Sequence, residues 1–146
     1  MKGRDAIIFY IIIILSLSIS PFVFDKSFNR YSDVITYLSI MIGFKITSLS
    51  ILYNSPLRKT LYDRKITPYG TELHRIKDMF KHSVFFEVYS VMLVFVLPEE
   101  IVSFSLYNYY IIIGRYLTIF PILIGSTFCF YKIFNELLTV FSYPTN

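Results

Sequence analysis

The sequence predicts an all-α integral membrane bundle of four transmembrane helices, with the third helix extended into the cytoplasm. Of its 146 residues, 55% are hydrophobic and only 16% are charged. The charges are collected in a few short stretches, whereas a soluble domain has them spread along the chain. Four apolar runs, each about long enough to cross a ~30 Å hydrocarbon core, take up almost all of the length. We therefore expect one transmembrane domain over residues 1–146, without a separate soluble catalytic domain.

The first two predicted spans cover residues 6–24 and 34–53. The first has no charge between Asp5 and Asp25, and the second is interrupted only by Lys45. A cleaved signal peptide is the alternative for the first run, because the chain starts with basic residues. However, the run is longer than the roughly 7–15 residues of a signal-peptide core, which favours a retained span.

The other two predicted spans cover residues 83–104 and 109–131. The third contains Glu87, and the fourth contains Arg115 near its start and Pro121 near its centre. Neighbouring groups in a membrane bundle can satisfy the carbonyl that a proline frees. Pro121 therefore predicts a kink in the helix and not a break.

The distribution of basic residues predicts the orientation. Ten Lys and Arg residues lie at the two termini or in the central segment 54–82, against two in the other connections. Cytoplasmic loops are enriched in Lys and Arg, so we expect both termini and this segment on the cytoplasmic side of the inner membrane. Insertion accounts for the basic residues without specific nucleic-acid binding, and the same face could receive a cytoplasmic protein. The basic face consists of Arg58, Lys59, Arg64, Lys65, Arg75, Lys77 and Lys81.

The central segment carries its own structural signals. Thr67–Gly70 contains Pro and Gly and predicts a turn. Apolar residues recur at helical spacing after it, so the third helix should begin near Thr71, in the cytoplasm, and enter the bilayer near Ser83. His74 and His82 are eight residues apart, which is a poor spacing for one metal ion.

Two ionisable residues fall inside the predicted membrane region. Lys45 lies about 12 Å from the cytoplasmic end of its span and Glu87 about 6 Å from the same side. Lysine side chains extend toward the nearer interface, so the two are predicted to form an ion pair, within a subunit or between subunits. Ser83 and Ser90 share the face of Glu87, and Ser48 shares that of Lys45. Three roles stay open: the pair fixes helix register, it lines or gates an ion path, or Lys45 extends alone to the headgroups.

Other residues predict interfacial anchoring and helix packing. Arg115 is expected to reach outward to Glu99 or Glu100. Small residues that let helices approach closely form stripes on spans two and four, including Ser39, Gly43, Thr47, Gly114, Thr118 and Gly125. Lys45 lies about 200° around the helix from Gly43, so span two needs protein neighbours on two sides. We therefore expect a homo-oligomer.

Enzymatic chemistry has no support in the sequence. It contains no nucleophile beside a base, no glycine-rich phosphate loop and no metal-ligand spacing, and its single cysteine is Cys129. No cofactor or metal is expected.

In total length, four spans and a basic segment after span two, the layout resembles the small four-span membrane proteins of prophages and mobile elements. One of these is the membrane component of the lambda phage exclusion system. The resemblance implies an inner-membrane protein that conducts ions or depolarises the cell in anti-phage defence. Two alternatives stay open, an immunity protein embedded in the membrane against a pore-forming bacteriocin and a non-conducting sensor or scaffold.

Overall fold

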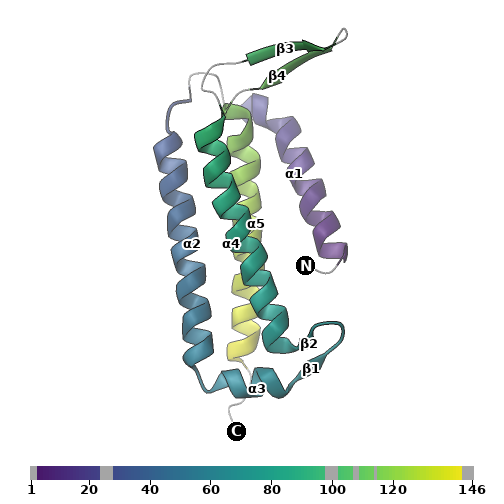
Figure 1. The fold of residues 1–146 in the computed structure, drawn as a ribbon, viewed down its shortest axis with the longest axis vertical. Helices are drawn as coiled ribbons and strands as arrows, with labels where there is room; N and C mark the ends of the chain where they lie inside the picture. The colour runs from purple at the N-terminus through teal and green to yellow at the C-terminus, as the bar shows by residue number, and fades with distance from the viewer. Residues whose placement is uncertain (1–2, 24–27, 98–101, 107–108, 114, 143–146) are drawn as a thin grey trace.

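Four long antiparallel helices form the protein (Figure 1). The structure is a computed structural model and describes residues 3–23, 28–97, 102–106, 109–113 and 115–142. The long helices are α1 (Gly3–Val23), α2 (Tyr31–Asn54), α4 (Glu72–Val96) and α5 (Tyr116–Phe141). Each is long and apolar enough to cross a membrane. The predicted fold class is confirmed, and by length and composition the chain is a multi-pass membrane protein.

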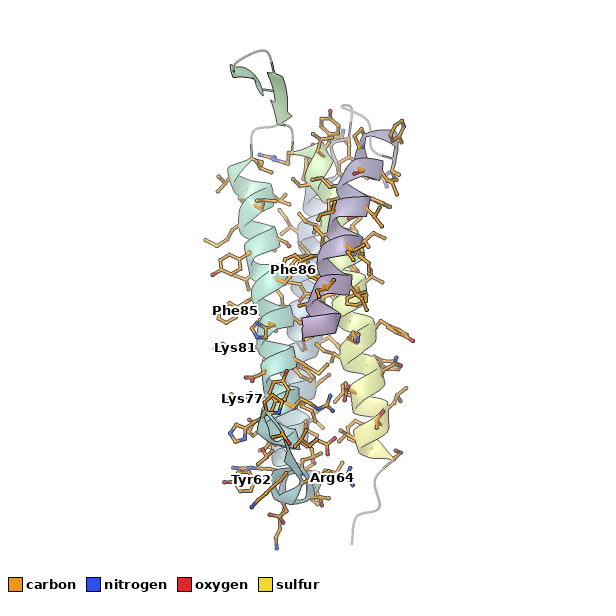
Figure 2. All side chains as sticks on the ribbon, turned by 90° about the vertical axis from the view of Figure 1, so that its right-hand side faces the viewer. Tyr62, Arg64, Lys77, Lys81, Phe85 and Phe86 are labelled. Carbon is orange, nitrogen blue, oxygen red and sulfur yellow. The ribbon has the colours of Figure 1, made fainter. Side chains whose placement is uncertain are left out.

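The helices form a bundle in which α4 and α5 lie between α1 and α2 (Figure 1 and Figure 2). Helix α2 packs mainly against α4, and α1 packs along α5. Figure 1 therefore shows α1 and α2 at opposite edges of the bundle. The first turn of α1 and the last turn of α5 point toward the same end, where α3 lies. We call this the α3 end.

The α3 end is built from the central segment. It contains a short helix, α3 (Leu57–Asp63), and two paired strands, β1 (Lys65–Ile66) and β2 (Gly70–Thr71). The predicted turn joins these strands, and Gly70 has φ +80°, a left-handed conformation that favours glycine. Thr71 caps α4 because its hydroxyl accepts the His74 N–H at 3.3 Å. The predicted start of the third helix is thus confirmed.

The opposite end corrects two predicted boundaries. Helix α4 ends at Val96, although the third span was expected to reach residue 104. Strands β3 (Val102–Leu106) and β4 (Tyr109–Ile113) form an antiparallel pair there, so the fourth span does not begin at residue 109. These segments are rich in β-branched and aromatic residues, which favour strands. Helix α5 also continues ten residues beyond the predicted end at residue 131.

The interior has two apolar clusters, one above the other. The cluster at the α3 end is Leu52, Leu57, Leu61, Leu73, Ile76, Phe80, Ile133, Leu137 and Val140. The cluster toward the β3–β4 end is Val34, Leu38, Val94, Ile119 and Ile122. The buried polar or charged side chains between the clusters are Lys45 on α2, Ser83, Glu87 and Ser90 on α4, and Ser126 on α5. The two clusters therefore enclose a polar centre.

The outer surface of the helices is apolar. Large hydrophobic side chains point outward along all four, including Phe22 at 89% and Val96 at 81% exposure. Soluble monomers rarely expose so much contiguous apolar surface. A lipid environment explains this surface directly.

Candidate functional site

The polar centre is an ion pair between helices α2 and α4. Lys45 Nζ donates to Glu87 Oε1, and both side chains are fully buried. Lys45 lies near the middle of α2, and the pairing lies within one chain. The structure thus brings together the two intramembrane charges that the sequence singled out, and it favours the intrasubunit form of the pair.

Ser126 on α5 completes the centre. Its hydroxyl donates to the same Glu87 oxygen at 2.7 Å and is also fully buried. The carboxylate therefore ties together three helices, α2, α4 and α5. Its second oxygen, Glu87 Oε2, has no hydrogen-bond partner among the described residues. One free acceptor is thus left inside an otherwise apolar bundle.

Because the ion pair is buried, breaking it should be costly in free energy. A charge left without its partner in a protein interior typically costs about 3–5 kcal/mol, because little solvent is available to stabilise it. Since Lys45 and Glu87 come from different helices, the pair fixes the rotation of α2 relative to α4. The polar centre can therefore set the register of α2 against α4.

The other serines predicted for this region are not bonded to the pair. Ser90 is buried on the face of Glu87 but donates to the carbonyl of Phe86 in its own helix at 2.8 Å. Ser83 is also buried on this face, and its hydroxyl has no partner among the described residues. Ser48 is half-buried. The expected common face of α4 is present, but the hydrogen bond to Glu87 comes from α5.

Gly125 lies at a close contact between helices. A Cβ atom added there would lie 2.6 Å from Phe86 Cζ and 2.9 Å from Ile13 Cδ1. The absence of a side chain thus allows α1, α4 and α5 to meet at one level, as predicted for a small-residue packing position. Thr118 is half-buried and donates to the Arg115 carbonyl. Gly114 lies outside the described residues.

The small stripe on α2 is exposed. Ser39, Gly43 and Thr47 all have exposed positions, and an added Cβ at Gly43 would meet nothing within 4 Å. Lys45, about 200° around the helix from Gly43, packs into the bundle on the opposite side of α2. The stripe therefore faces away from the bundle. Ser32, Thr36, Ser50 and Asn54 extend the same exposed row at spacings of three or four residues.

At the β3–β4 end, Arg115 contacts Leu97 and Tyr31, and its contact with Glu99 or Glu100 stays a prediction. Its Nε donates to the Leu97 carbonyl at 2.8 Å, and its guanidinium lies 4.9 Å from the centre of the Tyr31 ring. It therefore anchors the end of α4 and the start of α2 and α5. Glu99 and Glu100 lie outside the described residues.

The α3 end carries the predicted basic residues and one strong ion pair that was not predicted. Arg75 forms two parallel hydrogen bonds with Glu136, at 2.9 and 2.6 Å, and lies 3.5 Å from Glu72. Arg64 also pairs with Glu72, at 3.4 Å. Six of the basic residues keep side chains exposed: Arg58, Lys59, Arg64, Lys65, Lys77 and Lys81.

No known family model matches the chain. No curated protein and no solved structure matches it either. Its function must therefore be inferred from the site itself.

The chemistry of the site favours structural or ion-related roles. Among the described residues there is no group of three or more His, Cys, Asp or Glu side chains placed to hold a metal ion. The polar centre has one acid, one ammonium and one hydroxyl, all fully buried. This arrangement can hold helices in register or respond to charge in the membrane.

Ser126 is the main site residue that the sequence interpretation missed. It lies in a row of buried residues on α5 with Ile119, Ile122, Cys129 and Ile133, spaced by three or four. A hydroxyl at such a position in an apolar helix is the signal that could have identified it.

Proposed function

We propose that the chain is the subunit of a small homo-oligomeric channel that conducts ions and depolarises the inner membrane. The single observation that carries this proposal is the exposed row on α2 from Ser32 to Asn54, which contains Ser39, Gly43 and Thr47. This row runs the length of α2 and is exposed at every one of its positions. In a ring of copies, the α2 rows would face a common axis.

The row suits a path for hydrated ions. It is polar and uncharged, and each hydroxyl that bonds its own helix keeps lone pairs for water. Thr36 and Ser39, for example, donate to carbonyls one turn earlier at 2.8 Å. Open space at Gly43 allows neighbouring helices to approach closely. Closed cyclic symmetry is the usual arrangement for identical subunits.

The buried ion pair has a supporting role in this proposal. Lys45 lies about 200° around α2 from Gly43, so its bond to Glu87 keeps the small row outward. We therefore place the conducting path between subunits and not through the Lys45–Glu87 centre. The exposed basic residues of the α3 end support a cytoplasmic location for that end, by the positive-inside rule. They also offer a face for a cytoplasmic protein partner.

The direct test is ion flux from liposomes that contain the purified protein. Wild type should release a trapped ion and collapse an imposed membrane potential. Gly43→Leu should abolish the flux because its side chain narrows the path between the rows. The matched control is Ile14→Leu, since Ile14 is exposed on α1, at the opposite edge of the bundle (Figure 1). A monomeric protein that leaves liposomes tight would overturn the proposal.

Cell assays separate this function from the second candidate, an immunity protein against a pore-forming bacteriocin. The open face at Gly43 could receive a helix of a toxin instead of another copy. A depolarising subunit should slow growth when overexpressed, alone or upon phage infection, which is the setting implied by the resemblance to prophage proteins. An immunity protein should leave growth unchanged and protect against one toxin.

A further inference from the structure

A pocket of about 430 Å³ lies at the α3 end, where the last turn of α2, helix α3 and the first turn of α4 meet. In Figure 2, Tyr62 lies at this end, below Lys77 and Lys81 of α4. The pocket belongs neither to the polar centre nor to the exposed row of α2. Its lining residues are Tyr53, Arg58, Lys59, Tyr62, Leu73 and His74.

The packing of α3 explains why polar side chains line this pocket. Leu57 and Leu61 are buried in the apolar cluster at the α3 end. Residues four apart share one face of a helix, so Arg58 and Tyr62 lie together on another face, where both are exposed. The two leucines thus hold a basic and an aromatic side chain at the mouth of the pocket.

The pocket is basic. Arg58, Lys59 and His74 line it, and the lining residues that the structure describes include no Asp or Glu. Neither Arg58 nor Lys59 forms an ion pair with any described residue. The Arg58 guanidinium lies 5.7 Å from the centre of the Tyr53 ring, and a stacked guanidinium can still donate from its edges. Two positive charges therefore line the pocket without a carboxylate beside them in the lining.

The His74 ring adds a hydrogen-bond donor. Its Nδ1 lies 2.7 Å from the Thr71 hydroxyl, which also accepts the His74 backbone N–H at 3.3 Å. When the hydroxyl donates its proton to Nδ1, the neutral ring carries its own proton on Nε2. The Tyr62 ring lies 6.4 Å from the His74 ring, centre to centre. Thr71 and Tyr62 thus position the imidazole, and Nε2 is its donor for a ligand.

The pocket lies at the level of lipid headgroups. At 1.5 Å per residue, the 24 residues of α2 span about 36 Å, against a hydrocarbon core of about 30 Å. Tyr53, one residue from the end of α2, therefore falls in the interface, where tyrosine is enriched. Ile46 is exposed two turns nearer the bilayer centre on the same face of α2. An acyl chain can thus run along α2 from the pocket.

We propose that this pocket binds the phosphate of one anionic phospholipid from the leaflet at the α3 end. Arg58 and Lys59 balance the charge of the phosphate, and His74 Nε2 donates to one of its oxygens. Basic pockets on the cytoplasmic side of membrane helices bind such headgroups. A choline headgroup fits poorly, because its ammonium would meet two cations and Arg58 already lies over the Tyr53 ring. The site does not depend on ion conduction, and each subunit holds it alone.

The test measures lipid bound to the purified protein in mild detergent by native mass spectrometry. Phosphatidylglycerol and phosphatidylcholine are compared at equal concentration, with inorganic phosphate as a competitor. Wild type should retain phosphatidylglycerol in preference to phosphatidylcholine, and free phosphate should not displace it, because phosphate has no acyl chain. Lys59→Gln should weaken phosphatidylglycerol binding about five-fold, the effect of one basic charge at an anionic headgroup. Lys65→Gln is the control, because Lys65 is exposed on β1 and does not line the pocket.

A second pair of variants tests the imidazole. His74→Phe keeps a ring beside Tyr62 but removes the donor, so it should weaken phosphatidylglycerol binding about ten-fold, the loss of one hydrogen bond to a charged group. His74→Gln keeps an N–H donor and should bind more tightly than His74→Phe. Circular dichroism checks that every variant folds.

Three results would overturn the proposal. The first is equal retention of the two phospholipids by wild type. The second is identical binding of phosphatidylglycerol by Lys59→Gln and Lys65→Gln. The third is displacement of phosphatidylglycerol by inorganic phosphate at the same concentration, since the pocket would then bind a free anion and not a lipid.

Discussion

Breaking the buried ion pair by a single substitution should greatly lower the stability of the fold. Replacing Lys45 by Met leaves the Glu87 carboxylate with only the Ser126 hydroxyl as a partner. Replacing Glu87 by Gln leaves the Lys45 ammonium buried without a counter-charge. Each single substitution should cost about 3–5 kcal/mol, because an unpaired charge remains at a fully buried position. For a chain of this size that corresponds to a decrease in melting temperature of roughly 6–20 °C.

The double variant Lys45→Met with Glu87→Gln should recover much of that loss. With both charges removed, desolvation no longer opposes folding, and replacement of buried pairs by uncharged residues is often neutral or stabilising. The assay is thermal unfolding in detergent, followed by circular dichroism, on the four proteins of a double-mutant cycle. Lys59→Met is the control, since Lys59 is exposed on α3 and has no ion pair among the described residues. Additive losses, or single variants as stable as that control, would refute the reasoning.

Three further predictions concern the neighbouring contacts. Gly125→Ala should destabilise the bundle by about 1–3 kcal/mol, because the added methyl group clashes with Phe86 and Ile13. Gly43→Ala should leave the monomer at least as stable as wild type, because the added methyl group meets open space. Equal melting temperatures for the two variants would contradict the packing. Ser126→Ala should lower the free energy of unfolding by about 1.5–3 kcal/mol, because a hydrogen bond to a carboxylate is lost. Thr139→Ala is the control and should change stability little, because the exposed Thr139 hydroxyl bonds to a carbonyl of its own helix. Arg75→Lys should weaken the α4–α5 contact at the α3 end, because lysine cannot make two parallel hydrogen bonds to Glu136. The weaker contact should appear as faster amide hydrogen exchange in the last turns of α5. An unchanged exchange rate would contradict this prediction.

The existence of four spans could be predicted because length and hydropathy are strong signals for membrane helices. The boundaries of the spans were harder to predict from the sequence. The predicted fourth span ended at residue 131, where hydropathy falls, but Ile133, Leu137 and Val140 continue the buried row of α5. Helical periodicity persists outside the hydrocarbon region, so it marks the end of a helix better than hydropathy does.

The segment between α4 and α5 shows a second limit. Residues 101–113 are apolar and could belong to a helix or to a strand, and a short apolar run does not distinguish the two. The β-branched and aromatic content of Tyr109–Ile113 was the available signal for strands.

The candidate site was predictable to the extent that charge in a membrane demands a partner. Lys45 and Glu87 stood out because each is an isolated charge in an apolar run. Ser126 did not, since a hydroxyl is common in membrane helices and its bond to Glu87 depends on the register of α5 against α4. The pair Arg75–Glu136 was missed for the same reason, because the contact joins residues 61 positions apart.

The measurement that tests the central claim most directly is modification of a single cysteine in the α2 row during current recording. Thr47→Cys is made in a Cys129→Ser background and reconstituted in a planar bilayer, with Ile14→Cys, exposed on α1, as the control. If α2 rows line the path between subunits, a charged thiol reagent should decrease the current through Thr47→Cys and leave Ile14→Cys unchanged. Absence of current in the unmodified Cys129→Ser protein, or equal loss at both positions, would contradict the account.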